Sequence, residues 1–132
     1  MSAIVQRVQQ LGLPLDQFVV IGSGLLDAVG IRAADDIDLV LRADLFARLV
    51  KQPEWEVGVK NTELVITKGD VEAFLSWSSD SHPNFSELYE DGVEIDGIRF
   101  ANPAVITAWK RQHPSEKNTR DIALLEEYLA HA

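Results

Sequence analysis

Apolar residues in the first half of the chain follow two spacings, one typical of helices and one typical of strands. Apolar positions three and four residues apart predict a helix over 3–11, which Gly12 and Pro14 end. The unbroken apolar run at 18–21 predicts a strand that is buried on both faces. The same criteria predict a short helix over 23–29 and a strand over 36–41. They also predict a helix over 45–51, capped by Asp44.

Turn residues divide the second half of the chain into two hairpins and two helices. A Lys-Gly-Asp turn separates the apolar segments 63–67 and 71–77, and Asp96-Gly97, a favoured type I′ pair, separates 93–95 from 98–100. The polar segment 78–91 is expected to be irregular. The two helices are expected over 102–112 and 117–130. This order predicts an α+β (mixed α/β) fold, a mixed β-sheet flanked by helices, formed by one domain over residues 1–132.

Composition indicates an ordinary globular protein and narrows the expected partners. Apolar residues make up 46% of the chain and charged residues 25%, and the absence of cysteine excludes disulfides and thiolate metal sites. The formal net charge of −9 disfavours binding to duplex DNA, which requires a basic face. No signal-peptide pattern or membrane-length apolar stretch occurs, so we expect a cytoplasmic protein without a membrane partner.

Gly22-Ser23-Gly24 stands where the first strand ends and a helix begins. Glycine lets the backbone approach a ligand closely, and the N-terminus of a helix presents free N–H groups to phosphate. Ser23 adds a hydroxyl group. Taken alone, the pattern is more typical of a plain strand-to-helix turn.

Asp36-Ile37-Asp38 opens the next strand, where residues two apart point to the same face. Two carboxylates held together repel each other, and a divalent cation between them relieves the repulsion. Mg²⁺ is typically bound by one or two carboxylates together with substrate phosphates. The alternative is that Asp36 belongs to a solvated turn and Asp38 is a charge at the strand edge.

Taken together, these segments resemble a known signature. Gly22-Ser23, twelve intervening residues and then Asp36-Ile37-Asp38 are similar to the pattern of the DNA polymerase β-like nucleotidyltransferase superfamily. The resemblance implies a third carboxylate on a later strand, and Glu72 is the best match to it. Many members of the superfamily carry Asp there, so Glu72 is a departure. Asp70 and Glu94 are the alternatives for this carboxylate.

The C-terminal part extends the resemblance. Minimal nucleotidyltransferases often end with a hairpin, a helix bearing a lysine, and a Lys-Asp-x-x-Asp motif. The chain has Lys110 on the expected helix and Lys117-Asn118-Thr119-Arg120-Asp121 after it, with Asn118 in place of an acidic residue. The resemblance implies that Lys110 or Lys117 contacts triphosphate oxygens and that Asp121 orients a nearby basic group. Charges solvated on a helix surface are the alternative.

The implied activity is transfer of a nucleoside monophosphate, most plausibly AMP from ATP, to a hydroxyl acceptor. Two Mg²⁺ ions would be held by Asp36, Asp38 and Glu72, with the triphosphate bound by Gly22 and Ser23. The alternative is a catalytically inactive protein of the same fold, which binds nucleotides or forms half of a toxin–antitoxin pair. An acceptor site is expected to need a second chain, either a helical partner protein or another copy in a homodimer.

Three other side chains invite a functional interpretation. Trp77 and Trp109 are expected to form core or pocket wall rather than a base-stacking platform. His82 lies in the polar segment and is expected to be exposed. The histidines of the chain show no zinc-binding spacing.

Overall fold

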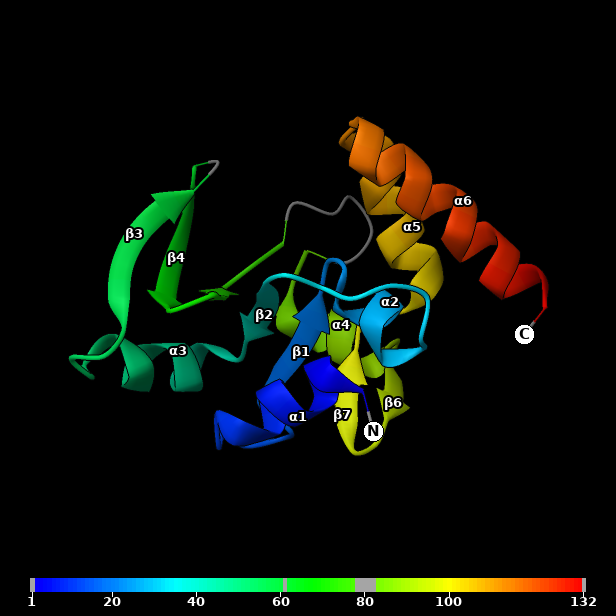
Figure 1. Ribbon diagram of the computed structural model, residues 1–132. Helices are drawn as coiled ribbons and strands as arrows, with labels where there is room; N and C mark the ends of the chain where they lie inside the picture. Colours follow the sequence, from blue (N-terminus) through cyan, green and yellow to red (C-terminus); the bar gives the residue numbers. More distant parts are fainter. Residues whose placement is uncertain (1, 61, 78–82, 132) are drawn as a thin grey trace.

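The computed structural model describes residues 2–60, 62–77 and 83–131. In this part the chain forms six helices and seven strands (Figure 1). The helices are α1 (Ala3–Gln10), α2 (Gly24–Ala28), α3 (Ala43–Val50), α4 (Phe85–Glu90), α5 (Pro103–Gln112) and α6 (Glu116–Ala130). The strands are β1 (Phe18–Ile21), β2 (Ile37–Leu41), β3 (Glu56–Lys60), β4 (Glu63–Lys68), β5 (Val71–Phe74), β6 (Val93–Ile95) and β7 (Ile98–Phe100).

The strands form one mixed sheet in the order β3-β4-β5-β2-β1-β7-β6. Parallel pairs join β2 to β5 and β1 to β7, whereas the pairs β1–β2, β3–β4, β4–β5 and β6–β7 are antiparallel. The α+β fold with a mixed sheet flanked by helices is therefore confirmed. Since β2 and β5 are parallel, their residues at equal height lie side by side, which positions the candidate site described below.

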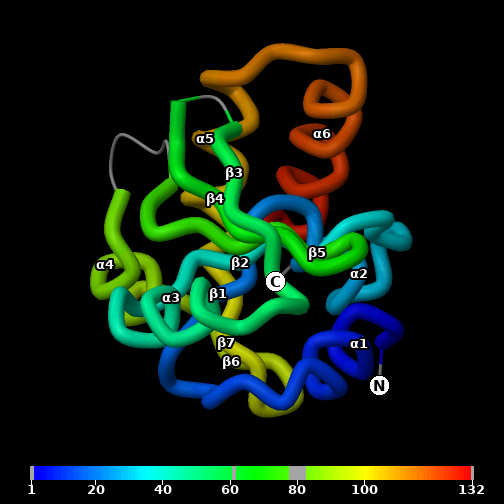
Figure 2. The backbone as a smooth tube through the Cα atoms, turned by 90° about the vertical axis from the view of Figure 1, so that its left-hand side faces the viewer, coloured from blue at the N-terminus to red at the C-terminus, as the bar shows by residue number. Residues whose placement is uncertain are grey.

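The core is built on the two central strands and the apolar faces of the helices. All four residues of β1 are buried, as the unbroken apolar run predicts. Both α1 and α3 bury one face, with side chains such as Val5 and Leu45 fully enclosed. The helices α5 and α6 pack against each other, and Figure 1 shows the β3–β4 hairpin on the opposite side of the molecule from them. Figure 2 looks onto the molecule from the side of this hairpin.

Several local predictions are confirmed by the backbone. Asp96 and Gly97 both have positive φ, 50° and 81°, as a type I′ turn requires. Asn102 caps α5 through a hydrogen bond from the Ala104 amide to its Oδ1 atom, at 2.9 Å.

Among the described residues, no helix combines the length and apolar character that crossing a membrane demands.

Three local predictions were wrong or incomplete. The strand β3 was not predicted, because all of its side chains are exposed and it shows no buried face. The helix α4 lies in the segment expected to be irregular, where Leu88 anchors it to the core. Asp44 does not cap α3, because the helix begins two residues earlier than expected, with Arg42 at its N-cap. The side chains of Asp44 and Arg42 form an ion pair instead. His82 lies outside the described residues.

Candidate functional site

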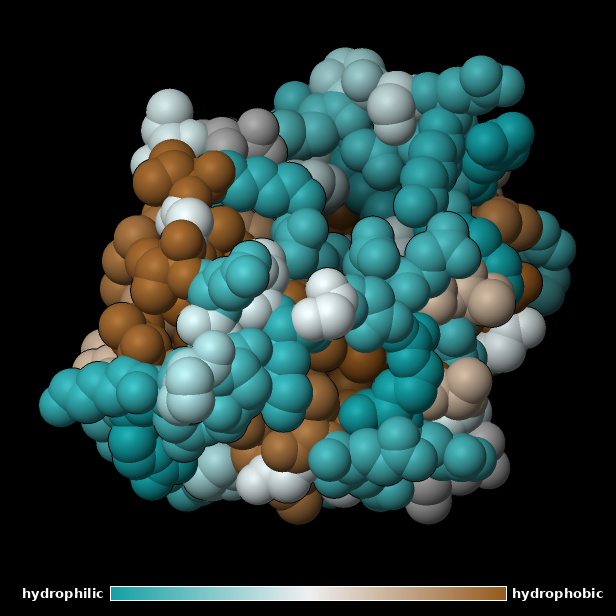
Figure 3. Space-filling view, turned by 60° about the vertical axis from the view of Figure 1, so that its left-hand side comes forward, coloured by the Kyte–Doolittle hydropathy of each residue, from teal (hydrophilic) through white to brown (hydrophobic). Residues whose placement is uncertain are grey.

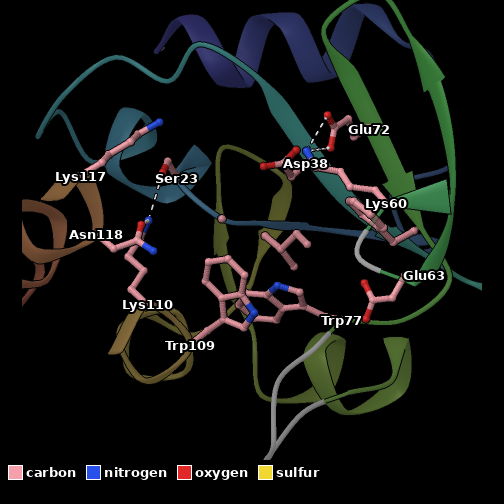
Figure 4. A pocket seen from close by; sticks show the side chains of 13 residues that line it. Ser23, Asp38, Lys60, Glu63, Glu72, Trp77, Trp109, Lys110, Lys117 and Asn118 are labelled. Carbon is pink, nitrogen blue, oxygen red and sulfur yellow. Dashed lines mark hydrogen bonds and ion pairs between the residues drawn. The ribbon is translucent and has the colours of Figure 1, made fainter. Parts of the chain in front are cut away.

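A pocket of about 220 Å³ opens between the centre of the sheet and the helices α5 and α6. Its polar lining comes from the ends of β1, β2 and β5, from the β3–β4 hairpin and from the two helices (Figure 4). The lining residues discussed below are Gly22, Ser23, Asp38, Lys60, Glu63, Glu72, Trp77, Trp109, Lys110, Lys117 and Asn118.

The turn after β1 forms one wall of the pocket. Gly22 has a φ of +67°, a conformation that side-chain-bearing residues rarely adopt. A Cβ atom on Gly22 would lie 3.0 Å from Oδ2 of Asp38, so the missing side chain also leaves room for that carboxylate. The next residue, Ser23, is the N-cap residue of α2, and its Oγ atom accepts hydrogen bonds from Nη2 of Arg32 at 2.9 Å and Nζ of Lys110 at 3.2 Å.

Two carboxylates lie side by side on the floor of the pocket. Asp38 on β2 is the register partner of Glu72 on the parallel strand β5, so both project from the same face of the sheet. Burial and the neighbouring charge of Glu72 raise the pKa of Asp38 to about 6, although the positive charge of Lys60 opposes the shift. Asp38 accepts no hydrogen bond from the described residues, so nothing in the fold requires it to be charged.

The ammonium group of Lys60 reaches into the pocket from the edge strand β3. Its Nζ atom donates hydrogen bonds to both carboxylate oxygens of Glu72, at 3.0 and 2.8 Å. Figure 4 shows this lysine beside Asp38 and Glu72. The ammonium group of Lys60 therefore places a positive charge beside the carboxylates of Asp38 and Glu72.

The other acidic candidates lie elsewhere. Asp36 is exposed, precedes the first residue of β2 and does not line the pocket, although its charge contributes to the raised pKa of Asp38. Asp70 lies in the β4–β5 turn and forms an ion pair with Arg7 of α1. Glu94 is on β6, at the opposite edge of the sheet from the hairpin. Within the described residues, no three acidic or histidine side chains gather closely enough to hold a metal ion by themselves.

A buried ionic cluster supports the opposite wall. Lys110 and Asp121 each expose only 2% of the side chain, and Nζ of Lys110 lies 3.0 Å from Oδ2 of Asp121. Arg32 donates to both oxygens of Asp121, at 2.8 and 2.6 Å. Burial would raise the pKa of Asp121, but the hydrogen bonds from Arg32 and Lys110 outweigh it and lower the pKa to about 2. Asp121 is therefore charged and orients both basic groups.

The two remaining predicted residues of this wall lie at the start of α6. Asn118 accepts a hydrogen bond from Nζ of Lys110 at 3.4 Å, so the residue that replaces an acidic group still contacts the buried lysine. Lys117 lines the pocket and makes no hydrogen bond or ion pair with any described residue. Its charge is close enough to lower the pKa of Asp38 and of Lys110.

Sequence reasoning missed three polar residues at or behind the pocket. Arg32 stands in a turn with no sequence signal, and only the fold brings it to Asp121. Lys60 and Glu63 lie beside the tip of the hairpin, where they are register partners. Burial raises the pKa of the Glu63 carboxyl group. An alternating pattern over 56–67 would have been the signal for this hairpin.

Aromatic rings close the remaining side of the pocket. The rings of Trp77 and Trp109 are stacked with centroids 5.4 Å apart, and Trp109 also stacks on His113 at 4.1 Å. Both tryptophans line the pocket, and Trp77 is 5% exposed. This agrees with their expected place as core and pocket wall.

Comparisons with known proteins place the fold. No protein-family model matches the sequence. No curated protein matches it either. Among solved structures, the chain is similar to ANT(2″)-Ia, an aminoglycoside nucleotidyltransferase, crystallised in complex with adenylyl-2″-tobramycin. The TM-score is 0.59 at 17% sequence identity, over 96% of this chain and 85% of that chain. The chain thus has a nucleotidyltransferase fold, as its sequence resemblance implies.

Proposed function

We propose that the chain is a Mg²⁺-dependent nucleotidyltransferase that transfers AMP from ATP to a hydroxyl acceptor. The observation that carries the proposal is the pairing of Asp38 with Glu72 on adjacent parallel strands, in a pocket that also contains Ser23 and the buried Lys110. The nucleotidyltransferase fold gives this arrangement its expected chemistry. The adenylyl group in the name of the neighbour's bound molecule supports AMP as the transferred group.

The basic wall is the proposed binding site for the triphosphate. Lys110 is pre-oriented by Asp121, so it loses little freedom when it meets a phosphate oxygen. Lys117, without a partner among the described residues, adds a second cation. The backbone at Gly22 and the hydroxyl of Ser23 are the remaining donors.

The acidic pair fits a divalent cation. Asp38 is half-buried beside a second carboxylate, and Lys60 already acts as a stand-in cation at Glu72. Mg²⁺ is typically held by one or two carboxylates together with substrate phosphates, a need that these two residues meet. We propose Asp36 as the third metal ligand. Its contribution to metal binding is the smallest of the three, because it is exposed and lies outside the pocket lining. A second ion would depend on this residue. When bound, the metal would supply stabilisation of the charge that develops on the phosphate oxygens.

The proposed reaction is a single displacement at the α-phosphorus. The acceptor oxygen forms a bond to the α-phosphorus, the bond from this phosphorus to the oxygen that bridges to the β-phosphorus breaks, and pyrophosphate leaves with the electron pair. The hydroxyl proton passes to a carboxylate oxygen of the pair formed by Asp38 and Glu72. The acceptor is proposed to lie against Trp109 and Trp77, with Glu63 beside them as a polar contact.

One observation favours the alternative function, a nucleotide-binding protein without transferase activity. The two hydrogen bonds from Lys60 to Glu72 occupy the carboxylate oxygens with which Glu72 would bind a metal ion. In this alternative Lys60 keeps its hydrogen bonds to Glu72 when ATP binds, and a partner protein binds the ATP-bound form of the chain.

Transfer of differently labelled ATP distinguishes these functions. Purified protein is incubated with Mg²⁺, a library of hydroxyl compounds and ATP labelled at either the α- or the γ-phosphate. The proposal predicts α-label on an acceptor and γ-label in pyrophosphate, both lost in Asp38→Asn and kept in the surface control Asp44→Asn. Label from the γ-position on an acceptor would identify a kinase, and no labelled product would favour the binding function.

A further inference from the structure

The β3–β4 hairpin exposes both an apolar surface and a free sheet edge. The strand β3 is the last strand of the sheet, and all five of its residues are exposed. Val57, Val59 and Leu64 are 55%, 72% and 45% exposed. Figure 3 shows hydrophobic side chains gathered over this hairpin. A free edge with unpaired N–H and C=O groups beside exposed apolar side chains is a template for another strand.

The two faces of β3 differ in character. Val57 and Val59 share one face, because residues two apart in a strand point to the same side. Leu64 joins them there as the register partner of Val59. Glu56 and Lys60 share the other face, on which Lys60 lines the pocket. An added strand would therefore meet apolar side chains on one face and charges on the other.

The sequence of β3 is self-complementary in the antiparallel sense. It reads Glu-Val-Gly-Val-Lys, with Gly58 at its centre. When two copies pair antiparallel about Gly58, Glu56 of each copy stands opposite Lys60 of the other, and Val57 stands opposite Val59. Opposite charges and β-branched residues are favourable cross-strand pairs. In this one register Glu56 gains a lysine partner and the valines of the two copies face each other, while Lys60, already paired with Glu72, gains a second carboxylate.

Nothing within a single chain requires a glycine at position 58, the centre of β3. Gly58 does not have positive φ, and the nearest atom to an added Cβ would be Cγ1 of Val65 at 4.0 Å. The fold of one copy therefore leaves room for a side chain. Glycine inside a strand often marks the close approach of another backbone, and Gly58 lies where the two copies would approach each other about the symmetry axis.

We propose that two copies of this chain associate through β3, as an antiparallel pair centred on Gly58 with reciprocal Glu56–Lys60 contacts. The pairing joins two sheets into one and covers the apolar side chains of both hairpins. It also brings a carboxylate of the second copy to Lys60, the lysine that bonds Glu72 in the pocket. The association does not depend on the proposed activity, and it is measured without nucleotide.

Charge reversal tests this register. Sedimentation equilibrium is measured on the full chain, on Glu56→Lys, on Lys60→Glu and on an equimolar mixture of the two variants. Each variant alone places like charges opposite each other at both contacts, so it is expected to be monomeric. In the mixture both contacts regain opposite charges, so a dimer of the two variants is expected, as for the unchanged chain.

Control substitutions and a folding measurement distinguish loss of the dimer from loss of the fold. Glu54→Lys and Lys51→Glu make the same charge changes at exposed positions outside β3 and are expected to leave the dimer intact. Circular dichroism checks that each variant is folded. The proposal is overturned if the unchanged chain is monomeric at high micromolar concentration, if either variant remains dimeric, or if the mixture does not associate.

Discussion

Replacing Asp38 by asparagine should stabilise the protein. The carboxylate is half-buried, lies next to Glu72 and accepts no hydrogen bond from the described residues. These surroundings raise its pKa from the ordinary value of 3.8 to about 6. A neutral amide of nearly the same shape removes the cost of keeping this charge in the folded state and leaves the packing unchanged.

The magnitude and its pH dependence follow from the pKa. Because the folded pKa lies above the unfolded one, folding favours the protonated form, and this favourable contribution is lost as the pH rises through about 6. One pKa unit corresponds to about 1.4 kcal/mol, so Asp38→Asn should raise the free energy of unfolding by about 3 kcal/mol near pH 8. Near pH 4, where Asp38 of the folded protein is protonated, the gain should fall to about 0.5 kcal/mol.

Urea denaturation of both proteins across this pH range measures the effect. The difference between variant and wild type at each pH isolates this group from the others that titrate. Asp44→Asn is the control, because its ion pair with Arg42 lowers the pKa of Asp44 to about 2, and its loss should not stabilise the fold at any pH. A difference for Asp38→Asn that is zero near pH 8, or that does not change with pH, would refute the reasoning.

Three further substitutions probe the site. Asp121→Ala should lower the free energy of unfolding by about 3 kcal/mol in urea, since it leaves two buried cations without their carboxylate; a loss under about 1 kcal/mol would contradict this. Gly22→Ala should cost about 1–2 kcal/mol in the same assay because of its positive φ and the nearby Asp38 oxygen; an unchanged stability would contradict the strain. Lys60→Gln should tighten Mg²⁺ binding in calorimetric titrations at least about tenfold, since it removes the cation competing at Glu72; weaker binding would show that the lysine supports the site.

The sequence predicts elements well where burial leaves a pattern. The fully buried β1 appears as an unbroken apolar run, and the Asp96-Gly97 turn requires its residue types. The strand β3 has only a short alternation, with Val57 and Val59 between Glu56, Gly58 and Lys60, and both of its faces are exposed in a single chain. Elements that depend on an exposed edge or on a partner are therefore the ones that periodicity misses.

The sequence motif leads to part of the pocket lining, and the function of these residues stays a prediction. Gly22 and Asp38 could be found because their short spacing along the chain marks neighbouring strands. Arg32 could not, because its partner Asp121 is 89 residues away and only the packing of α6 brings them together. Lys60 belongs to the strand that was missed, and so its contact with Glu72 was missed too.

Calorimetric titration of ATP with and without Mg²⁺ tests the central claim most directly. The titration is made on the wild type, Asp38→Asn and Glu72→Gln, with Asp44→Asn as the folded control. Our account predicts that Mg²⁺ strengthens ATP binding to the wild type and the control, and that this gain disappears in both site variants. Binding that ignores Mg²⁺, or a gain that survives in Asp38→Asn and Glu72→Gln, would contradict a nucleotide–metal site at the carboxylate pair.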